Sequence, residues 1–112
     1  MAVEAPISIA AAVLLGQATG SCAPTPTAEC ITAAKRDLKA GEVLDGGGDY
    51  TVSGVCEKAT VARAENLLPL GLAGGAVLKQ DVAKGQAITY GMVEMKTDSF
   101  VAKLRRMQDA LT

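Results

Sequence analysis

The sequence predicts a mainly β domain built from two pseudo-repeated strand–turn–strand units, with one helix before them and one after. Three observations support this fold class: a motif that returns after 44 residues, an apolar N-terminal segment with helical periodicity, and an amphipathic C-terminal segment. The chain has 112 residues, of which 49% are apolar. That is enough for one compact domain with a modest core, and too little for a second independent domain.

Residues 1–16 are predicted to form an amphipathic or buried helix. Pro6 suits a first helical position, and Gly16 can end the helix. The apolar positions that follow a period near 3.6 are Ile7, Ala10, Ala11, Leu14 and Leu15. Residues 17–29 then mix Gly, Thr and Pro, which is typical of a linker.

The same apolar segment, followed by Cys22, can also be read as an export signal that ends in a lipid-modified cysteine. An export signal needs basic residues before its apolar core, and the only charged residue there is Glu4. No apolar run approaches the ~20 residues that a membrane span requires. We therefore expect a cytoplasmic chain that has no membrane partner.

A motif of the form K-x-D-[LV]-x-x-G-[EQ]-x-[LI] starts at Lys35 and again at Lys79. Strands are expected over residues 30–36 and 76–82, each leading into a tight turn and a second strand. One such hairpin alone is marginal in water, so we expect a pseudo-twofold in which each unit covers the apolar face of the other. Together they define a domain over residues 30–96.

Two residue types within the motif are suited to tight turns. Gly41 and Gly85 can take the positive φ that a turn requires. Asp37 and Asp81 can accept backbone N–H groups at their own turns, while the first lysine of each copy can pair with a carboxylate or stay solvated. We assign these four residues a structural role, with ligand binding as the less favoured interpretation.

Between the two copies, the sequence predicts a glycine-rich turn, a strand and an irregular crossover. No Lys-Ser/Thr follows the glycines of "DGGGD", so a flexible turn before the strand "YTVSGV" is favoured over a phosphate loop. Residues 57–66 can form one or two helical turns. Pro69 and the glycines of "LLPLGLAGG" interrupt regular structure. Its leucines are expected to be buried: Leu67, Leu68, Leu70 and Leu72.

Residues 97–112 are predicted to form an amphipathic helix. Thr97 or Ser99 can cap it, and Asp98 complements its N-terminus. Its apolar stripe, which can dock on this domain or on a second subunit, consists of Phe100, Leu104, Met107 and Leu111. Its basic residues are expected to form a solvated face, with an anion or partner contact as the less favoured alternative: Lys103, Arg105 and Arg106.

Composition argues against most kinds of functional site. The formal net charge of −1 gives no strong attraction to nucleic acid, and the absence of histidine removes the commonest general base and zinc ligand. The spacing of Cys22, Cys30 and Cys56 fits neither a zinc site nor a disulfide framework, so we expect half-buried thiols in a reducing compartment. We predict no catalytic, cofactor-binding or metal-binding residue in this chain.

The segments "AAKRDLKAGEVLDG", "YTVSG" and "LLPLGLAGGAVLKQDVAKGQAITYGMVE" together resemble the SAF superfamily. That superfamily includes the antifreeze-like domain of sialic acid synthases and a group of pilus and flagellar assembly proteins. The resemblance implies a β-clip fold. With "EAPISIA" near its start, the chain is most similar to the C-terminal domain of homoserine-dehydrogenase-like NAD(P)-dependent oxidoreductases, which include deoxyxylulose phosphate reductoisomerase-like enzymes. This resemblance spans nearly the whole chain.

In those oxidoreductases the nucleotide-binding and catalytic regions precede the SAF-type tail. The resemblance therefore implies that residues 1–16 are the end of a catalytic region, and that NAD(P) belongs to a parent enzyme and not to this chain. It implies a non-catalytic accessory domain that contacts the rest of the parent or a second copy of itself, as a homodimer. The alternative is a stand-alone SAF module that binds sugar acids or acts as a chaperone in pilus or flagellar assembly.

Overall fold

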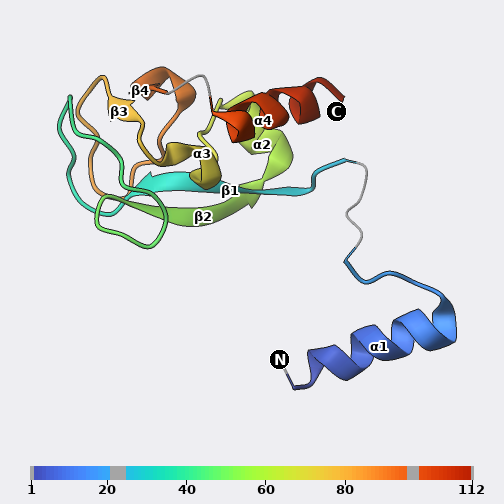
Figure 1. Ribbon diagram of the computed structural model, residues 1–112. Helices are drawn as coiled ribbons and strands as arrows, with labels where there is room; N and C mark the ends of the chain where they lie inside the picture. The colour runs from blue at the N-terminus through green and yellow to red at the C-terminus, as the bar shows by residue number, and fades with distance from the viewer. Residues whose placement is uncertain (1, 21–24, 96–98, 112) are drawn as a thin grey trace.

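The computed structural model describes residues 2–20, 25–95 and 99–111. The described residues form four α-helices, one 3-10 helix and two small antiparallel sheets (Figure 1). In chain order the elements are α1 (Glu4–Leu15), β1 (Ala28–Ala34), β2 (Val52–Lys58), α2 (Ala59–Ala64), α3 (Leu70–Ala73), β3 (Val77–Leu78), η1 (Tyr90–Met92), β4 (Val93–Glu94) and α4 (Phe100–Leu111). The structure thus mixes helices and strands. Outside the strands, isolated β-bridges pair further stretches of extended backbone.

The two copies of the repeat cross each other. At the crossing point, the N–H group of Leu38 donates to the carbonyl oxygen of Val82 at 2.8 Å, and the N–H group of Val82 donates back to Leu38 at 2.9 Å. These two residues are counterparts in the motif, 44 positions apart. A local pseudo-twofold axis therefore passes between them.

The same exchange continues away from this axis. The N–H group of Ala34 donates to the Gln86 carbonyl at 3.0 Å, and its counterpart Leu78 donates to the Glu42 carbonyl at 2.9 Å. The two arms of each turn are thus paired with the other copy and not with each other. The prediction of one strand–turn–strand hairpin per copy is wrong in this respect, because these backbone groups find their partners across the repeat.

The core lies where the two copies meet. Its largest fully buried side chains are Leu38, Leu44, Leu68, Leu78, Ile88, Val52 and Thr32. Leu44 and Ile88 hold matching positions of the motif, so each copy contributes the same apolar position to a shared core. Because the core is shared, the apolar side chains of each copy are buried against those of the other copy.

The crossover between the copies is short and mostly irregular. α2 lies inside the segment predicted to be helical, and that prediction is confirmed. α3 is a single turn that follows Pro69. Leu67 and Leu68 are buried, as predicted, whereas Leu70 and Leu72 are only partly buried and pack against the core from outside.

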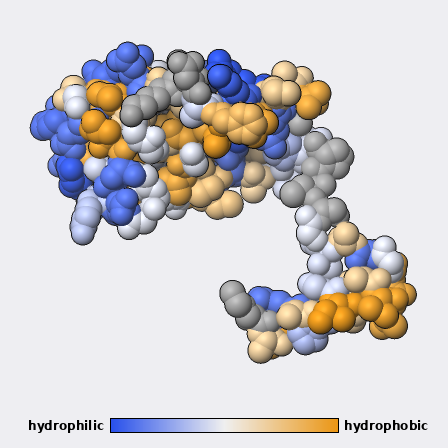
Figure 2. Space-filling model, viewed as in Figure 1, coloured by the Kyte–Doolittle hydropathy of each residue, from blue (hydrophilic) through white to orange (hydrophobic). Residues whose placement is uncertain are grey.

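α1 lies apart from the rest of the molecule, and none of its residues is buried (Figure 1). Gly16, with φ 62, ends the helix as predicted. Glu4 and Ser8 are its only polar residues, so apolar side chains surround its axis and form no single stripe. Figure 2 shows apolar side chains exposed on the visible face of this helix. The prediction of an amphipathic helix is therefore wrong, and α1 is not buried within this chain. Among the described residues, no helix has the length and apolar character to cross a membrane.

Candidate binding site beneath the C-terminal helix

The four turn residues singled out in the sequence lie at the crossing of the two copies. Gly41 and Gly85 have φ values of 89 and 81, which are the positive angles predicted for their turns. The carboxylate of Asp81 accepts the N–H group of Ala40 at 2.9 Å, and that of Asp37 accepts the N–H group of Lys84 at 2.8 Å.

Each aspartate thus serves the turn of the other copy. The expectation that Asp37 and Asp81 cap their own turns is wrong, because the crossing of the copies brings the opposite turn closer. Asp81 also forms an exposed ion pair with Lys39 at 3.1 Å. These contacts join the two turns to each other across the crossing of the copies.

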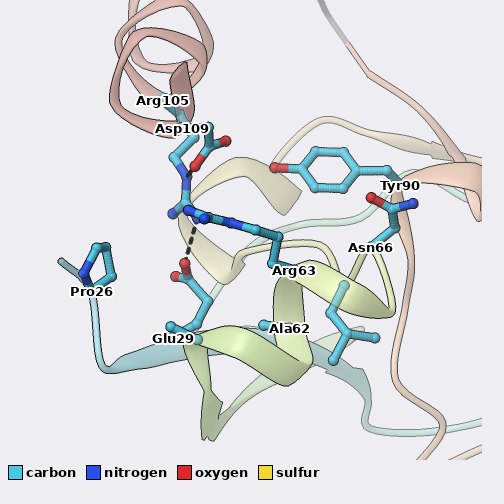
Figure 3. Close-up of a pocket in the computed structure, with 10 residues that line it drawn as sticks. Pro26, Glu29, Ala62, Arg63, Asn66, Tyr90, Arg105 and Asp109 are labelled. Atoms are coloured by element: carbon cyan, nitrogen blue, oxygen red, sulfur yellow. Dashed lines mark hydrogen bonds and ion pairs between the residues drawn. The ribbon is translucent and has the colours of Figure 1, made fainter. Parts of the chain in front are cut away.

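A pocket of about 250 Å³ lies elsewhere, beneath α4. Figure 3 shows its polar side chains converging from separate elements. They are Glu29 of β1, Arg63 of α2, Asn66, Tyr90 of η1, and Arg105 and Asp109 of α4. The cavity is smaller than a typical drug-sized pocket and matches a compact polar molecule.

Arg105 attaches α4 to the domain. Its Nη2 lies 2.6 Å from Oε2 of Glu29, and its Nε lies 2.8 Å from Oδ1 of Asp109, one turn along α4. The hydrogen bond with Glu29 is the main cause that raises the pKa of the Arg105 guanidinium above its ordinary value. Charge-assisted hydrogen bonds of this kind fix the orientation of a helix as well as its position.

The attachment of α4 turns its apolar stripe away from the domain. Ala102 is buried and Arg105 is partly buried, so these residues face the domain. The predicted apolar stripe is exposed along its whole length: Phe100, Leu104, Met107 and Leu111. The assignment of Arg105 to a solvated face is wrong, because Glu29 supplies a charged partner that is distant in sequence. Ser99 caps the helix as predicted, whereas Thr97 and Asp98 lie outside the described residues.

Hollows on either side of α4 show that its packing is loose. One, of about 280 Å³, is lined by Leu72, Tyr90 and Met95. The other, of about 470 Å³, separates Cys30 of β1 from Leu104 of α4. α4 is therefore joined to the domain by the Arg105–Glu29 ion pair, and its apolar contacts with the domain are light.

Tyr90 and Asn66 form the opposite wall of the polar pocket. Burial is the main cause that raises the pKa of the Tyr90 phenol, so its hydroxyl is a hydrogen-bond donor at neutral pH. Asn66 has φ 52, a left-handed conformation that asparagine tolerates, and its carbonyl accepts the Tyr90 N–H at 3.0 Å. This bond fixes the two residues relative to each other.

The pocket offers several charged and polar groups that can bind a polar molecule. Two arginines face two carboxylates, so its charges are balanced, while the Tyr90 hydroxyl and the Asn66 amide offer further hydrogen-bonding groups. Across the described parts of the chain, no group of three or more His, Cys, Asp or Glu side chains could hold a metal ion. Such a site selects a ligand by hydrogen bonds and shape.

Sequence reasoning did not identify this pocket. Arg63, Asn66 and Tyr90 carried no motif, and each becomes significant only because the chain brings η1 against α2. The spacing of Arg105 and Asp109, one helical turn apart, was a signal for their ion pair. Glu29, the distant partner, had no such signal.

The expectation of half-buried thiols is wrong for the two cysteines that can be described. Cys30 and Cys56 are both free and exposed, whereas Cys22 lies outside the described residues. β1 and β2 bring Cys30 and Cys56 opposite each other, as the register of the ladder requires.

Comparison with known proteins adds no assignment: no protein-family model and no curated protein matches the sequence.

Proposed function

We propose that this chain is a non-catalytic accessory domain of the SAF type, with a β-clip fold, that acts by docking. Its partner is the rest of an NAD(P)-dependent oxidoreductase of the homoserine-dehydrogenase-like type, or a second copy of itself in a homodimer. The observation that carries the proposal is the exposure of apolar side chains on α1 and α4 beside a closed core. The family and the parent enzyme rest on the sequence resemblance, and a cytoplasmic location rests on the lack of basic residues before the apolar N-terminal segment.

α1 supports docking because its composition does not suit a solvated helix. Its exposed apolar side chains are Ile7, Ile9, Val13, Leu14 and Leu15. Burial of apolar surface stabilises an interface by roughly 25 cal/mol per Å². A helix that is apolar on all sides is normally enclosed by other elements, so α1 fits a position inside a larger assembly.

α4 supports docking in a different way. Its polar face is fixed to the domain through Arg105, so its apolar stripe is held facing outward. Val101 adds to that stripe and is 57% exposed. Exposed apolar patches of this kind mark interaction surfaces in soluble proteins.

Light scattering during gel filtration tests the proposal. We expect a dimer at concentrations on the order of tens of micromolar, dissociated by the double change Leu104→Asp and Met107→Asp. Lys103→Gln, on the same helix, is the control and should leave the dimer intact. A wild-type monomer in which α1 resists proteolysis would contradict docking, because α1 would then be covered by its own domain. A monomer in which α1 is cleaved would point to the parent enzyme as the partner.

The pocket beneath α4 favours a second candidate, a module that binds a small sugar acid. Arg63 and Arg105 suit a carboxylate, and Asn66 and the Tyr90 hydroxyl suit hydroxyl groups. Calorimetric titration with gluconate would show weak binding that Tyr90→Phe reduces and Lys84→Ala, outside the pocket, leaves unchanged. If gluconate produces no heat of binding in the wild-type chain, this candidate fails and the docking proposal is unaffected.

A further inference from the structure

Cys30 and Cys56 face each other across the β1–β2 ladder. The register places Ala28 opposite Lys58 and Ala34 opposite Val52, with the two cysteines directly opposite each other between these ends. Directly opposite residues of antiparallel strands project from the same face of the sheet. The two thiols therefore share one face, although 26 positions separate them in the chain.

The hydrogen bonds at the two ends of the ladder identify the kind of pair. The N–H group of Ala59 donates to Thr27 at 3.1 Å, and that of Lys35 donates to Thr51 at 2.9 Å. Hydrogen-bonded and non-hydrogen-bonded pairs alternate along an antiparallel ladder. Counting inward from either end makes the Cys30–Cys56 pair non-hydrogen-bonded.

A non-hydrogen-bonded pair brings its side chains closer than the other kind. Its Cα atoms are about 4.5 Å apart. A disulfide needs a Cα separation of roughly 4.4–6.8 Å. The ladder therefore holds Cys30 and Cys56 at a separation that a disulfide can span without moving the backbone.

Both thiols are accessible to a reagent. Cys30 and Cys56 are free and exposed, near the end of the ladder that leads into α2. A Cβ atom at Gly54 would lie 2.7 Å from Sγ of Cys30, so this sulfur rests over Gly54. Rotation of Cys30 about its Cα–Cβ bond is enough to turn the sulfur toward Cys56.

We propose that Cys30 and Cys56 form a reversible dithiol–disulfide site that reacts with low-molecular-weight disulfides such as oxidised glutathione. The thiolate of one cysteine attacks a sulfur of the small disulfide, which releases one small thiolate and leaves a mixed disulfide. The thiolate of the other cysteine then attacks the protein-bound sulfur and releases the second small thiolate. The two protein thiols lose two electrons and two protons, and the small disulfide is reduced to two thiols.

A disulfide between Cys30 and Cys56 would change the surroundings of α4, which carries part of the proposed docking surface. Cys30 lines the hollow beneath α4, opposite Leu104. Oxidation would draw the Cys30 sulfur away from this hollow and join β1 to β2 at its edge. The site itself depends only on the β1–β2 ladder, so it stands or falls independently of the docking proposal.

The test uses the full chain with Cys22→Ser, so that only the opposed pair can react. After equilibration with oxidised and reduced glutathione, we expect the intact mass to fall by two hydrogens, and peptide mapping to show a Cys30–Cys56 link. Reduced glutathione in excess should restore both thiols. A chain that carries glutathione on either cysteine without closing the link would overturn the proposal.

A register control shows whether the ladder is responsible. The double change Val55→Cys and Cys56→Ser moves the second thiol to the neighbouring position, on the other face of β2. This variant should keep a mixed disulfide, and its closure should be at least about tenfold slower than that of the native pair, because it lacks the effective concentration set by the ladder. Circular dichroism would establish that both chains are folded. Equal closure rates in the two folded chains would refute the role of the register.

Discussion

Between residues 28 and 95 the chain covers most of its apolar side chains with its own other half, whereas in α1 and α4 such side chains face solvent. The difference follows from where each region finds its partners. Each copy of the repeat supplies backbone acceptors and apolar side chains to the other, so the β region is complete within one chain. Among the described residues, the helices α1 and α4 leave most of their large apolar side chains exposed, and on this exposure the docking proposal rests.

Core truncation should show the largest contrast between the two regions. Leu68→Ala removes a fully buried side chain and should lower the free energy of unfolding by about 2–5 kcal/mol, because it leaves a cavity. Leu14→Ala, on exposed α1, should change it by less than about 0.5 kcal/mol. Denaturant melts at protein concentrations too low for dimer formation would measure the unfolding free energy of both variants. Equal losses would show that α1 packs on the β region in solution.

The two turns should respond equally if the pseudo-twofold governs the fold. Gly41→Ala and Gly85→Ala each force a side chain into a positive-φ conformation, and each should cost about 1–2 kcal/mol in denaturant melts. Gly71→Ala, in α3, is the matched control, because no neighbouring atom lies within 4 Å of its new Cβ and its φ is not positive. A loss at only one of the two turns would break the equivalence of the copies.

Acid should weaken the β region through Asp81. The Ala40 N–H group and then Lys39 lower the pKa of the Asp81 carboxyl below its usual value of about 3.8. The unfolded chain therefore takes up this proton first as the pH falls. The Asp81 carboxylate therefore stabilises the folded chain fully at pH values above the pKa of the unfolded chain. This stabilisation is lost as the pH falls through the lowered pKa of the folded chain. Asp81→Asn should flatten the decline of the denaturation midpoint between about pH 5 and pH 3. An unchanged pH profile would mean that the contact across the turns contributes nothing.

Much of the β region could be predicted because its signals are local and duplicated. The motif placed Gly41 and Gly85 at turns, and Gly16 marked the end of α1, since positive φ is a property of the residue and its immediate neighbours. The exchange of partners between the copies could not be predicted. A hairpin and a crossed pair bury the same side chains, and only their hydrogen bonds differ.

The face of α4 and the pocket beneath it depend on distant residues, which local patterns do not encode. Helical periodicity identified the apolar stripe correctly, but it could not tell whether the stripe docks on this domain or on a second subunit. The ion pair of Arg105 with Glu29 directs the stripe away from the domain, and these two residues are far apart in sequence. The pocket residues Arg63 and Tyr90 share this dependence.

The crossing of the two copies also sets the order in which the chain can fold as it is synthesised. Thr32 of β1 receives its backbone partners from Leu68 and Ile88, which the ribosome adds much later. Until Ile88 has emerged, the first copy has no second copy to pair with, and contacts of such long sequence separation form slowly. The first copy therefore cannot complete its pairing, and its apolar residues stay accessible to chaperones, until the second copy has emerged.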